Sequence, residues 1–83
     1  METRIAIIGI IVYDKEAVEK INDLLHTYSE FIIGRMGLPY REKELSVITV
    51  VMDAPNDIIG ALSGKLGRVK DITVKTVYSK AGV

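Results

Sequence analysis

The segment Arg4–Val12 is apolar at both odd and even positions and is rich in β-branched residues. A strand with one solvent-exposed face alternates apolar and polar side chains, so a continuous apolar pattern predicts a strand that is buried on both faces. Leu45–Met52 has the same character. We therefore expect these two segments to form the centre of one sheet.

The rest of the chain supplies two helices and two further strands. Asp14 is placed as the N-cap of a helix over about 15–28, and Pro55-Asn56-Asp57 begins a second helix, with Gly67 as its C′ glycine. Phe31–Leu38 is predicted as a strand that Pro39 ends, and Lys70–Tyr78 as a last strand with clean alternation. The order βαββαβ predicts an α+β, ferredoxin-like sandwich whose antiparallel sheet has the strand order 4-1-3-2.

One face of such a sheet is left without helices. It carries either Ile5, Ile7 and Ile11 or the alternate set Ala6, Ile8, Ile10 and Val12, and the sequence leaves both choices open. Either set exposes several large aliphatic side chains, which soluble monomers seldom do over a contiguous area. We therefore expect a homo-oligomer formed through this open face. A monomer that tolerates the patch is the alternative.

Composition limits the possible partners and compartments. The 83 residues, expected to form a single domain over 1–83, carry 11 basic and 11 acidic side chains, so no long-range field attracts nucleic acid or a membrane. With no cysteine, the chain has no disulfide, no iron–sulfur ligation and no thiolate zinc site. A soluble cytoplasmic protein without direct nucleic-acid binding is expected.

The second predicted helix has glycines at helical spacing. Gly60, Ser63 and Gly64 are expected opposite its apolar stripe, where interior glycines cost about 1 kcal/mol each relative to alanine. A ligand or a partner backbone that approaches closely would explain them, with Ser63 and Lys65 offering hydrogen bonds or charge. Glycines that are merely tolerated are an equally weighted alternative.

Two further side chains, Arg35 and His26, complete the candidates. Arg35 lies in an otherwise apolar strand. Its charge either discourages aggregation through an edge strand or binds a carboxylate or other anion. His26, the only histidine, is expected near a helix C-terminus and would bind metal only if an interface doubled it. The sequence shows no nucleophile–base pair and no paired carboxylates, so no catalytic residues and no cofactor are predicted.

Three motifs carry a resemblance to a known family. L-L-H-T-Y-S-E at Leu24–Glu30, G-R-M-G-L-P at Gly34–Pro39 and I-G-A-L-S-G-K-L-G at Ile59–Gly67 are similar to those of the iron-only hydrogenase system regulators, over nearly the whole length. The resemblance implies a ferredoxin-like fold related to amino-acid-binding regulatory (ACT) domains and to the effector domain of nickel-responsive repressors. It also implies a regulatory or accessory role in a cell with an [FeFe] hydrogenase.

The chain departs from those relatives in two places. It lacks the cysteine and the further histidine of a nickel site, and its turn Val12-Tyr13-Asp14-Lys15 lacks the glycine usual in amino-acid-binding domains. We therefore expect a non-enzymatic oligomer that senses a small ligand or docks on a hydrogenase-system protein. Any role in transcription would need a DNA-binding partner. A purely structural assembly factor is the alternative.

Overall fold

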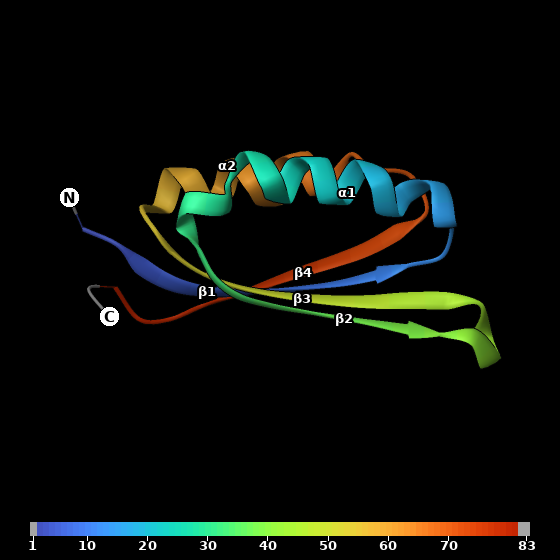
Figure 1. Cartoon of the computed structure of the whole chain (residues 1–83). Helices are drawn as coiled ribbons and strands as arrows, with labels where there is room; N and C mark the ends of the chain where they lie inside the picture. The colour runs from blue at the N-terminus through green and yellow to red at the C-terminus, as the bar shows by residue number, and fades with distance from the viewer. Residues whose placement is uncertain (1, 82–83) are drawn as a thin grey trace.

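Both helices cover the same face of a four-stranded sheet, and the other face is open (Figure 1). The computed structural model describes residues 2–81. Short 3₁₀ turns at Ser29–Phe31 and Arg41–Lys43 flank the second strand. The elements are β1 (Arg4–Val12), α1 (Lys15–Thr27), β2 (Ile32–Tyr40), β3 (Leu45–Ala54), α2 (Asn56–Gly67) and β4 (Ile72–Tyr78).

The sheet has the order β2-β3-β1-β4, with every neighbouring pair antiparallel. This is the predicted 4-1-3-2 order read from the other edge, so the ferredoxin-like α+β architecture is confirmed. The two doubly apolar segments are the central strands, as expected. The predicted burial on both faces is wrong within the chain, because the helices cover only one face and Ile7 and Ile11 of β1 are 44% and 36% exposed on the other.

The helix-covered face takes the even-numbered side chains of β1. Ile8 and Ile10 are completely buried, and Val50 and Met52 of β3 lie beside them. α1 contributes Ala17, Ile21 and Leu25 to this core, and α2 contributes Ile59, Leu62 and Leu66. The odd-numbered set, Ile5, Ile7 and Ile11, therefore faces outward. This resolves the choice that the sequence left open.

Local signals set the starts of both helices. The Asp14 carboxylate accepts a hydrogen bond from the backbone N–H of Glu16 at 3.1 Å, which confirms Asp14 as the N-cap of α1. Pro55 precedes α2 with φ of −60°, a value that its ring imposes and that leads directly into the helix.

Several predicted ends are wrong. β3 continues to Ala54 instead of ending at Met52, and β4 begins at Ile72 instead of Lys70. β2 does not stop at Leu38 but continues through Pro39 to Tyr40, because an edge strand has one side with no ladder for a proline to interrupt. Gly67 is the last residue of α2 and not the residue beyond it, since Arg68 ends the helix in a right-handed conformation at φ −90°. No left-handed residue is needed there, so the glycine is not required as a cap.

Candidate functional site

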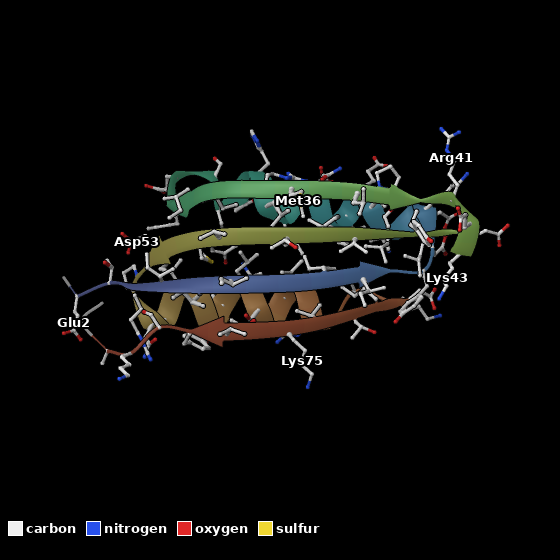
Figure 2. The ribbon with its side chains drawn as sticks, turned by 90° about the horizontal axis from the view of Figure 1, so that it is seen from below. Glu2, Met36, Arg41, Lys43, Asp53 and Lys75 are labelled. Atoms are coloured by element: carbon white, nitrogen blue, oxygen red, sulfur yellow. The ribbon has the colours of Figure 1, made fainter. Side chains whose placement is uncertain are left out.

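The open face of the sheet is ordered in rows that cross all four strands. The register aligns three such rows, running from β2 through β3 and β1 to β4. They are Gly34, Val51, Ile7 and Val77; Met36, Thr49, Gly9 and Lys75; and Leu38, Val47, Ile11 and Thr73. Figure 2 looks directly onto this face, with the helices behind the sheet.

Apolar exposure on the open face is concentrated on β2 and β1. Met36 is 59% exposed, Leu38 53% and Ile7 44%. The β4 end of two of the three rows is polar instead, with Thr73 and Lys75. Side chains of β2, β3 and β1 therefore form the apolar part of the open face, and β4 borders it. Val77 is an exposed apolar exception on β4.

The glycine side of α2, defined by Gly60 and Gly64, is a second surface. Both residues are exposed, and a Cβ added to either would meet nothing within 4 Å. Neither glycine is therefore required by packing within the chain. Whether this side contacts a ligand or a partner stays a prediction.

Ser63 does not share that side. Its hydroxyl oxygen lies 2.6 Å from that of Thr76 on β4, so the side chain packs half-buried between α2 and the sheet. Lys65 donates a hydrogen bond to the Tyr28 hydroxyl at 3.0 Å and lies 5.2 Å from the centre of that ring. It thus connects α2 to the end of α1. The expected grouping of Ser63 with the two glycines on one side is wrong.

Arg35 and His26 lie apart from these residues. The Arg35 guanidinium reaches from β2 to the Asn22 side-chain oxygen of α1 at 2.8 Å, on the helix-covered side of the sheet edge. His26 is exposed in the last turn of α1, as its position in the sequence predicted. The structure does not bring Arg35, His26 and the glycine side together into one site.

A groove at the end of the sheet had no signal in the sequence. It has a volume of about 830 Å³ and lies between the β1–α1 turn and the β2–β3 hairpin. Tyr13, Val18, Tyr40 and Leu45 are among its lining residues, and Lys15 and Arg41 lie among acidic side chains there. Residues far apart in the sequence form it, which is why no local motif marked it.

Residues 2–81 contain neither a cluster of metal ligands nor a membrane-spanning helix. No three His, Cys, Asp or Glu side chains lie close enough together there to hold a metal ion. No helix in this part of the chain is long and apolar enough to cross a lipid bilayer.

Comparison with known proteins gives one family and several similar structures. The family model "TM1266-like: Iron-only hydrogenase system regulator, putative" matches residues 4–76. The uncharacterized protein TM1266 from Thermotoga maritima is 45% identical with a TM-score of 0.90, covering 95% of this chain and 100% of that one. A search of curated proteins gives no match.

Two more distant structures share the fold alone. The C-terminal domain of MgtC from Mycobacterium tuberculosis is 9% identical with a TM-score of 0.73, covering 96% of this chain and 92% of that one. A dimeric ferredoxin-like protein from an uncultured marine organism is also 9% identical, with a TM-score of 0.55 and coverages of 95% and 94%.

Proposed function

This chain belongs to the TM1266-like family of iron-only hydrogenase system regulators, and from that premise we propose that it is a regulatory or accessory module of the hydrogenase system. The observation that carries the proposal is the family match itself, which spans every helix and every strand except the last residues of β4. The name of the family identifies the cellular system as that of the iron-only hydrogenase. How the chain acts within it has to be argued from its surfaces.

The module acts by binding and not by catalysis. The hydroxyl of Ser63 is paired with another hydroxyl, that of Thr76, and not with a base that could activate it as a nucleophile. The ammonium of Lys65 is engaged with the Tyr28 phenol. The side chains from which chemistry was conceivable therefore serve to join α2 to its neighbours.

Binding begins with self-association in this proposal. The open face carries large apolar side chains that the fold leaves uncovered, and burial of apolar surface gives about 25 cal/mol per Å². One distant structural neighbour is described as a dimeric ferredoxin-like protein, so this fold is compatible with a dimer. A cytoplasmic oligomer then presents the glycine side of α2, Gly60 and Gly64, to a partner protein or ligand.

An interaction protein without any ligand is the second candidate. The exposed apolar side chains of the open face favour it, because contiguous exposed apolar patches mark sites of protein–protein interaction. Melting in the presence of amino acids, nucleotides and divalent metal ions separates the two. A ligand of the native state at one hundred times its Kd stabilises by about 2.7 kcal/mol, so a sensor shows a clear rise in Tm.

The main experiment is affinity capture under anaerobic conditions. The tagged chain is incubated with extract from cells that express an iron-only hydrogenase, and the bound proteins are identified by mass spectrometry. An unrelated ferredoxin-like domain with the same tag is the control. Enrichment of a hydrogenase subunit, a maturation protein or a DNA-binding regulator of the hydrogenase genes is the expected result. If no such protein exceeds the control, the proposed function is wrong.

A further inference from the structure

In two of the three rows of the open face, a glycine on one strand is matched by a large apolar side chain two strands away. In one row Gly9 of β1 lies two strands away from Met36 of β2, with Thr49 of β3 between them. In the adjacent row the sizes are reversed, since Gly34 lies on β2 and Ile7 on β1. Each glycine therefore has a large residue at the mirrored position across β3.

Gly9 has no reason within the chain to be a glycine. A Cβ at this position would meet only the backbone oxygen of Lys75, at 4.0 Å, an ordinary contact. Glycine in a strand interior lowers stability relative to a residue with a side chain, because its unfolded chain is more flexible and it packs nothing. Between Ile7 and Ile11 it leaves a hollow in the line of apolar side chains that β1 presents on the open face.

We propose, building on the oligomer of the proposed function, that a second copy of this chain covers the open face. The two-fold axis that relates the copies runs parallel to the strands, over β3, and passes Thr49. Rotation about an axis parallel to the strands places β2 of one copy over β1 of its partner and β3 over β3. Met36 of each copy then enters the hollow at Gly9 of the other, and Ile7 lies over Gly34. Met36 and Ile7 thus each meet a glycine, as close packing between two sheets favours, while in the third row Leu38 lies over Ile11.

The positions of charge distinguish this axis from its neighbours. An axis between β3 and β1 would place Lys75 over Met36 and would bury two ammonium groups without partners, which is strongly unfavourable. An axis along β1 would leave Met36 and Leu38 uncovered. With the axis on β3, Lys75 stays at the border of the interface, and its side chain in Figure 2 points out past the edge of β4.

The exposed area of the chain supports a partner of this size. The surface of 5651 Å² exceeds the roughly 4,900 Å² typical of a folded monomer of this mass. The excess is roughly 750 Å², close to the roughly 800 Å² that each partner buries in a standard stable interface. The elongated shape of the molecule, 41 × 19 × 18 Å, accounts for a surface above the average and makes a long face available.

Thiol cross-linking tests the axis directly, because the chain has no cysteine of its own. In a dimer of Thr49→Cys the two thiols face each other across sheets about 10 Å apart, within reach of a short bismaleimide. In Lys75→Cys, each thiol lies two strands from the axis, so the pair is separated sideways by about 19 Å. We expect covalent dimer from the first variant and little from the second. The opposite pattern, or no cross-linking in either, overturns the proposal.

A size swap tests the fit at Gly9. Gly9→Met fills the hollow and clashes with Met36 of the partner, so the dimer dissociation constant should rise at least tenfold in sedimentation equilibrium. The double variant Gly9→Met, Met36→Gly exchanges the large side chain and the hollow, so it should recover most of the lost dimer affinity. Circular dichroism checks that each variant is folded. A Gly9→Met variant that dimerises normally, or a swap that recovers nothing, contradicts the proposal.

The outcomes separate this inference from the function on which it rests. Light scattering that gives a monomeric wild-type chain refutes the oligomer of the proposed function, and the axis with it. A wild-type dimer with the wrong cross-linking pattern refutes the axis alone. Failure to capture a hydrogenase-system protein refutes the proposed function without affecting either result on the dimer.

Discussion

Replacing both glycines on the glycine side of α2 by alanine should make the protein more stable. Gly60 and Gly64 lie inside the helix, and a methyl group added to either meets no atom within 4 Å, so no clash offsets the gain in helix propensity. Each substitution is worth about 1 kcal/mol in a helix interior, or about 2 kcal/mol for the pair. In a chain of this size that raises Tm by about 8 to 16 °C.

Thermal and urea unfolding at one fixed protein concentration measure the effect, because Tm depends on concentration in an oligomer. Ala61→Gly is the matched control. Ala61 is exposed on the same helix, so its replacement should lower stability by about 1 kcal/mol. If the double variant is no more stable than the wild type while the control loses the expected amount, the reasoning about Gly60 and Gly64 is refuted.

The same variant tests what the glycine side is for. If a partner backbone approaches α2 there, Gly60→Ala with Gly64→Ala should lose captured protein while gaining stability. If the amount of captured protein is unchanged, both glycines are merely tolerated in the helix and contact no partner. Stability and partner binding are thus expected to move in opposite directions, a combination that a merely unfolded variant cannot produce.

Three further predictions concern stability. Ser63→Ala and Thr76→Ala should each cost about 1 kcal/mol in urea unfolding, but the double variant should cost less than their sum, because the two hydroxyls pair only with each other in this contact. Arg4→Ala removes the hydrogen bond from its guanidinium to the carbonyl of Ser79, so amide exchange at Ser79 should accelerate roughly tenfold while distant core amides keep their rates. Ile8→Ala should cost 2–5 kcal/mol and Ile8→Val only about 0.5–1.5 kcal/mol, since Ile8 is fully buried, and equal costs would contradict a close-packed core.

The sequence predicted the strands best where burial is strongest. β1 begins and ends at the predicted residues, because a continuous apolar, β-branched stretch favours a central strand along its whole length. Errors occurred at the edge. Pro39 was taken as a strand end because proline interrupts a ladder, but that reasoning applies only to a strand with neighbours on both sides.

The site residues were harder to predict than the fold. Helical periodicity placed Gly60 and Gly64 correctly on the exposed side of α2 but could not show that Ser63 reaches Thr76, which lies on a strand 13 residues later. The contact between Arg35 and Asn22 is of the same kind. Such pairs depend on how helices sit on the sheet. The significance of Gly9 likewise appeared only when the register placed it in a row with Met36.

At Gly9, selection for folding stability and selection for assembly favour different residues. A library of variants at this position, sorted only for resistance to protease at low concentration, should accumulate valine, isoleucine and other strand-forming residues. The same library sorted for assembled protein should return glycine. A survey of tolerated mutations that scores folding alone would therefore label the most restricted position of the sheet as a free one.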